Sequence, residues 1–125
     1  MELVLITPLL VVLLLFAVVA GRFAVAANDV AEAARDAARE ASLWRDPVQA
    51  TDRGTARGLA SLAAVHLACH DPIVTVDPED LRPGGEVVAE VHCTVEVADA
   101  LGLRVAGAKT FSARAVAVVD RYRGR

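Results

Sequence analysis

The chain has 125 residues and a formal net charge of −3 at pH 7, which is enough for one small domain. No block of basic residues is present, so the composition gives no support to a nucleic-acid partner.

Residues 3–20 form one apolar stretch, LVLITPLLVVLLLFAVVA, which Thr7 and Pro8 alone interrupt. As a helix it would span about 27 Å, close to the hydrocarbon core of a bilayer. A helix that is apolar on every face seldom lies in the core of a soluble domain. We therefore predict a transmembrane segment over residues 1–21 and a water-exposed domain over residues 22–125.

The helical pattern continues without proline to about residue 43. Alternating spacings of four and three residues define an apolar stripe along this extension, with charged side chains on the other faces. The stripe would pack either on a partner helix or on the chain's own domain, and both interpretations stay open. Its residues, which we call the helix seam, are Phe23, Ala27, Val30, Ala34, Ala37, Ala41 and Trp44.

Asp46 followed by Pro47 predicts the start of a second helix, which would run to about residue 68 and end at Asp71-Pro72. Gly54 and Gly58 would weaken this helix. Its inner side is expected to carry apolar and sulfur-containing side chains together with one histidine. These residues are Leu59, Leu62, Val65, His66 and Cys69.

From residue 73 the apolar period changes to two, which indicates strands at residues 73–77, 86–98 and 109–120. Pro83 and two glycines mark a turn at residues 80–85. We predict an α+β fold with a long N-terminal helix, a second helix and a small antiparallel sheet of three to four strands. One face of the last two strands should be apolar: Val87, Ala89, Val91, Cys93, Val95 and Val97, then Phe111, Ala113, Ala115, Ala117 and Val119.

The N-terminal segment resembles a known family. Glu2 precedes Pro8 by six residues in an apolar span, and an alanine-rich run follows at residues 26–42. Together with the second helix, two cysteines and the strands, this arrangement resembles the TadE-like family, pilin-like minor components of the Tad pilus. The resemblance implies a structural subunit in the cell membrane, with a single span and its C-terminal domain outside the cytoplasm. It implies the membrane, other pilin-like subunits and a prepilin peptidase as partners.

The resemblance also assigns Glu2 and Pro8 to assembly. Glu2 would pair with the N-terminal amine of a neighbouring subunit, or it would be a residue at headgroup level in water. In this family the peptidase typically cuts after a glycine that lies upstream of the glutamate. That glycine does not precede Glu2 here, so either the true start lies upstream or this member is not processed.

In an exported domain, Cys69 and Cys93 are most simply a disulfide between the second helix and the sheet. A zinc site is the alternative, because His66, His70 and His92 lie near the cysteines in the sequence, although their spacing matches no standard zinc pattern. We predict the disulfide and no metal, and the sequence leaves the role of the three histidines open.

Nothing in the sequence matches a nucleophile elbow, a phosphate-binding glycine loop or an HExxH motif, so we expect no enzyme and no cofactor. Asp77, Glu79 and Asp80 are expected to be solvated turn residues.

Two alternatives to the pilin-like subunit are a metal-binding or enzymatic domain, which the motifs disfavour, and a small secreted or anchored binding domain. In the latter a signal peptide would be cleaved at Ala24-Val25-Ala26. The positive-inside rule, applied to Arg22, Arg35 and Arg39 after the span, would instead place the C-terminal domain in the cytoplasm.

Overall fold

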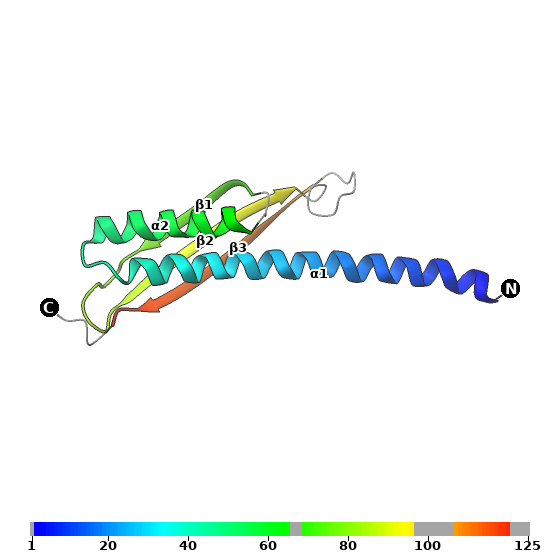
Figure 1. Cartoon of the computed structure of the whole chain (residues 1–125), viewed down its shortest axis with the longest axis horizontal. Coiled ribbons are helices and arrows are strands. Elements are labelled where there is room, and N and C mark those ends of the chain that lie inside the picture. The colour runs from blue at the N-terminus through cyan, green and yellow to red at the C-terminus, as the bar shows by residue number, and fades with distance from the viewer. Residues whose placement is uncertain (1, 66–68, 97–106, 121–125) are drawn as a thin grey trace.

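A computed structural model describes residues 2–65, 69–96 and 107–120. Two helices, α1 (Glu2–Ala41) and α2 (Pro47–Ala64), precede three strands, β1 (His70–Asp77), β2 (Glu86–Glu96) and β3 (Ala108–Val118). The strands form one antiparallel sheet in the order β1-β2-β3. The second half of α1 and all of α2 cover one face of this sheet, and the first half of α1 projects beyond it (Figure 1). The predicted α+β fold is confirmed.

We call the packed part, which comprises the second half of α1, α2 and the sheet, the head. The side of α1 that faces α2 and the sheet consists of small apolar residues at helical spacing. Their short side chains let α1 lie close to α2 and the sheet. Its buried residues are Ala26, Val30, Ala33, Ala34, Ala37, Ala38 and Ala41.

One member of the predicted seam falls outside this contact, because Ala27 is exposed and Ala26 is buried in its place. Trp44 lies beyond the last residue of α1 but is partly buried against the core. The seam was drawn with a period of 3.5 residues, whereas a straight helix has 3.6 residues per turn. The difference is small over this length, since Phe23 packs against the core and Ala41 is fully buried.

The start of α2 is as predicted, because Asp46 Oδ1 accepts a hydrogen bond of 2.9 Å from the Val48 backbone amide. The predicted inner side was wrong in part. Leu62 is buried, but Leu59 is 38% exposed and α2 ends at Ala64, before Cys69. His66 lies outside the described residues. The side of α2 that packs on α1 and the sheet consists of Ala50, Gly54, Gly58 and Leu62, at a constant spacing of four residues.

Gly54 and Gly58 are therefore contact residues as well as weak helix formers. A Cβ atom at Gly54 would lie 3.0 Å from the Ala37 carbonyl oxygen and 3.0 Å from Ala41 Cβ. A Cβ atom at Gly58 would lie 2.9 Å from Val74 Cγ1 and 3.2 Å from Ala37 Cβ. The two glycines allow α2 to approach α1 and β1 together.

We expect Gly58→Val to destabilise the head by about 2 kcal/mol, because overpacking against Val74 outweighs the gain of replacing a helical glycine. Urea unfolding of the full chain in detergent, followed by Trp44 fluorescence, would measure the change. Ala56→Val on the exposed side of α2 is the control and should change stability by less than about 1 kcal/mol. Equal effects of the two substitutions would contradict the close-approach role of Gly58.

The apolar face of the sheet is the predicted one within the described residues, and it packs against the helices. β1 begins earlier than expected, at His70, so Asp71 and Pro72 belong to this strand. The register between β1 and β2 shifts between His70 and Ile73, and Asp71 has a φ of 51°. A proline cannot donate to the strand ladder, so this irregularity lets an edge strand include Pro72.

Candidate membrane and assembly surface

The first half of α1 is a continuous apolar surface. Every side chain from Leu3 to Val18 is exposed, and this segment is long and apolar enough to cross a membrane. It is the one helix of that kind in residues 2–65, 69–96 and 107–120. An exposed apolar surface of this extent is typical of contact with lipid or with other helices.

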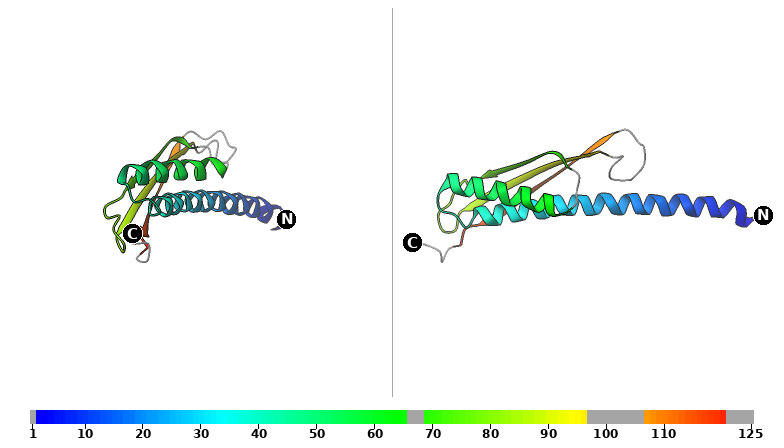
Figure 2. Two further views of the ribbon diagram at one scale, coloured as in Figure 1. Left: turned by 60° about the vertical axis from the view of Figure 1, so that its left-hand side comes forward. Right: turned by 45° about the horizontal axis from the view of Figure 1, so that its top comes forward.

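The head begins where this apolar segment ends. The Phe23 ring lies 6.0 Å from the ring of Phe111 on β3, measured between centroids, and Ala26 is already buried. Residues 2–18 project freely, which corresponds to about 26 Å of helix. Because α1 is continuous, a membrane around this segment would lie directly below the head, without a flexible linker (Figure 2).

Glu2 and Pro8 lie on the exposed end of α1, in its first three turns. Pro8 lacks an amide hydrogen, so the Val4 carbonyl loses its usual helical donor. Nearby, Thr7 Oγ1 donates a hydrogen bond of 2.8 Å to the Leu3 carbonyl. This end of α1 thus offers a carboxylate and a weakened backbone hydrogen-bond ladder within an otherwise apolar surface.

The structure places the helix seam mostly inside the head. Val30, Ala34, Ala37 and Ala41 are fully buried, and Phe23 and Trp44 are partly buried against the core. Of the two interpretations of this stripe, packing on a partner helix or on the chain's own domain, these residues follow the second. Gly21, by contrast, has open space around its Cβ position.

A disulfide joins Cys69 to Cys93, with a Cα–Cα distance of 5.3 Å. It links the segment before β1 to the buried face of β2, where Cys93 is fully buried.

Of the residues considered for a zinc site, His66 lies outside the described part of the chain, and the others do not converge on one site. His70 lies on β1 rather than on a helix, and the side chains of His70 and His92 lie on the outer face of the sheet, opposite to Cys93. Their Nε2 atoms lie 3.8 Å and 2.9 Å from carboxylate oxygens of Glu96 and Glu90, respectively.

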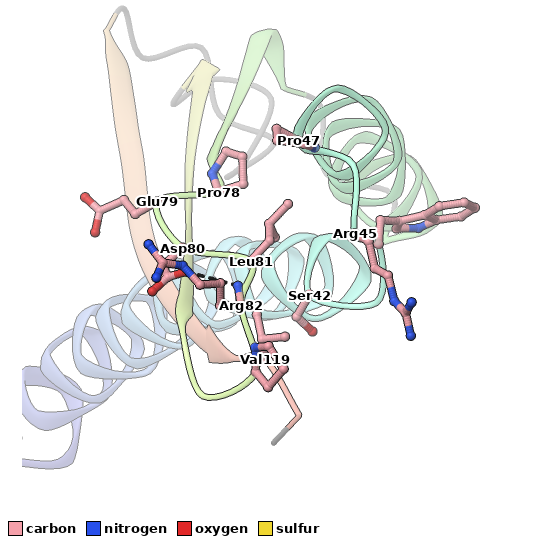
Figure 3. A pocket seen from close by; sticks show the side chains of 11 residues that line it. Ser42, Arg45, Pro47, Pro78, Glu79, Asp80, Leu81, Arg82 and Val119 are labelled. Atoms are coloured by element: carbon pink, nitrogen blue, oxygen red, sulfur yellow. Dashed lines mark hydrogen bonds and ion pairs between the residues drawn. The ribbon is translucent and has the colours of Figure 1, made fainter. Parts of the chain in front are cut away.

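A pocket of about 480 Å³ lies between the α1–α2 turn and the β1–β2 turn (Figure 3). Both turns are at the end of the head farthest from the N-terminus (Figure 1). Trp44, Leu81 and Val119 contribute apolar surface to it, and Asp80 pairs with Arg82 at 3.4 Å. The Ser42 hydroxyl donates to the Arg39 carbonyl at 2.7 Å, so this lining hydroxyl is bonded to the end of α1. Asp77, Glu79 and Asp80 are exposed, as predicted.

These features define a class of protein: one helix that can span a membrane, and an α+β head built around the continuation of that same helix. The model of the family described as TadE-like protein matches residues 1–39, and the predicted resemblance is thereby confirmed for the N-terminal segment. The matched residues cover the apolar half of α1, Glu2 and Pro8, and most of the face that packs on the head. No curated protein and no solved structure matches the chain.

Proposed function

We propose that this chain is a membrane-anchored, pilin-like subunit that takes part in Tad-type pilus assembly or a related secretion apparatus. The observation that carries the proposal is the single helix α1, which is exposed and apolar in its first half and packs on α2 and the sheet in its second half. A head that is rigidly attached to its anchor can be positioned by contacts between anchors, as a subunit of a fibre requires.

We propose that the head lies outside the cytoplasm. The Cys69–Cys93 disulfide supports this orientation, because disulfides persist in oxidising compartments. Arg22, Arg35 and Arg39, which follow the span, favour the opposite orientation by the positive-inside rule. We give the disulfide more weight, since the resemblance to the TadE-like family also implies a C-terminal domain outside the cytoplasm.

We propose that partner subunits contact the exposed half of α1, since most of the helix seam is covered. Gly21 has no contact within the head, although a glycine inside a helix costs about 1 kcal/mol relative to alanine. The close approach of another helix would account for a glycine there, as close packing accounts for Gly54 and Gly58. Glu2 would pair with the N-terminal amine of a neighbouring subunit within the membrane.

A secreted domain with a cleaved signal peptide is the second candidate, and the packing of α1 weighs against it. Cleavage after Ala26 would remove Ala26 itself from the core and would remove Phe23 from its contact with Phe111. The cut would also fall in the middle of α1, so the continuous helix that enters the head would be lost.

N-terminal sequencing of the protein from fractionated cells tests the proposal. We expect the chain in the membrane fraction or in sheared pili, with residues 3–26 retained. A prepilin peptidase that cuts after a glycine would leave an N-terminus upstream of Glu2. A soluble species that begins at Ala27 would contradict the proposal and would support the secreted binding domain.

A further inference from the structure

In the second half of α2, the side that faces away from α1 and the sheet is unusually apolar. Ala56, Ala60 and Ala63 are exposed there, and Leu59 is 38% exposed at its margin. After Arg57, α2 contains no charged residue. A helix at the surface of a soluble domain normally presents charged and polar residues on this side, so the outer face of α2 is unpartnered in the single chain.

The outer face of the sheet is uncovered as well, on the opposite side of the head (Figure 2). Ile73, Val116 and Val118 are 56%, 52% and 59% exposed, and Val88 is paired directly with Val116. Carboxylates border these valines, because Asp77 pairs with Val88 and Glu90 lies one row further along the sheet.

We propose that the outer face of the sheet binds the outer face of α2 of a second copy of this chain. This inference rests on the proposed function, and it names the head-to-head contact within the assembly. Val88, Val116 and Val118 would pack on Ala56, Leu59, Ala60 and Ala63, and both surfaces would bury apolar area that water otherwise contacts.

The two surfaces carry opposite net charge. Arg53 and Arg57 outnumber Asp52 on the exposed sides of α2, and Asp77, Glu86 and Glu90 outnumber Arg114 beside the valines of the sheet. Pairing two sheet faces with each other would instead oppose surfaces that each carry several carboxylates. The charges therefore favour the contact between unlike surfaces over the contact between like ones.

The anchor adds a geometric constraint. Two copies in one membrane must keep their α1 helices pointing the same way, and stacking the sheet of one head on the α2 side of the next keeps them so. A contact between two different surfaces leaves one of each free at the ends, so copies can be added in a row. This geometry suits a subunit that assembles into a fibre or a ring.

Cysteine cross-linking of the full chain in its native membrane tests the contact. Val116→Cys and Ala60→Cys lie on opposite sides of the head, so a bond between them can form only between copies. Native Cys69 and Cys93 are bonded to each other and do not compete. We expect the double variant to give a ladder of dimers and larger species on mild oxidation, and each single variant to give less than about a tenth of that product.

Ala17→Cys, on the exposed half of α1, reports helix association separately from the head contact. A cross-link at Ala17→Cys without a ladder in the double variant would overturn the head contact and leave the proposed function standing. A dimer formed by Val116→Cys alone would overturn it too, because it would place two sheet faces together. The absence of cross-links in all variants would contradict both the contact and the proposed function.

Discussion

A chain that carries Glu2→Gln is expected to fold as the wild type does but to fail in assembly with other pilin-like subunits. The substitution keeps the shape of the side chain and removes the charge that would attract a neighbour's amine. If the pairing within the membrane is worth about 2 kcal/mol, its loss lowers the association constant roughly thirtyfold. Lost pili, or lost co-purification from detergent extracts, would report the defect.

The matched control for this experiment is Glu32→Gln, since Glu32 is an exposed carboxylate on the part of α1 that belongs to the head. We expect this variant to assemble normally. Urea unfolding of both variants should match the wild type, because Glu2 has no contact with the head in the structure. Assembly of Glu2→Gln at the wild-type level would reduce Glu2 to a residue at the membrane surface and would remove the electrostatic basis of the proposed assembly.

The double substitution Cys69→Ala/Cys93→Ala is expected to destabilise the head by about 3 kcal/mol, because the disulfide closes a loop with a sequence separation of 24 residues. The loop contains β1 and the β1–β2 turn, so its freedom in the unfolded chain is large. Urea unfolding in detergent, followed by the fluorescence of Trp44, would measure the loss. Trp44 suits this purpose because its Nε1 donates to Glu40 at 3.2 Å and the Arg53 guanidinium lies 5.0 Å from its ring.

Wild-type protein treated with a reductant is the control, and it should unfold at nearly the same urea concentration as the double variant. A wild-type protein that is insensitive to reductant but destabilised by a chelator would contradict the disulfide and favour a metal site. Such a result would also weaken the proposed orientation of the head, which rests largely on an oxidising environment.

The sequence by itself determined the features that depend on local pattern. The apolar run at the N-terminus is longer than a helix of a soluble domain tolerates, and it predicted the projecting half of α1. The change of apolar period from 3.6 to two predicted the strands and the buried face of β2. The cap at Asp46 and Pro47 predicted the first residue of α2. In each case the signal lies within one element, where side-chain direction follows directly from backbone geometry.

Tertiary structure alone decided which surfaces meet. Gly54 and Gly58 suggested a weak helix, yet both are buried where α2 packs on α1 and β1. The spacing of four from Ala50 through Leu62 was the signal that could have revealed them. The seam gave the direction of the buried face of α1 but misplaced Ala27, and the sequence left its partner open. The period of the apolar residues shows which side of a helix or strand is buried. Which other element covers that side depends on close packing between segments that are far apart in the chain.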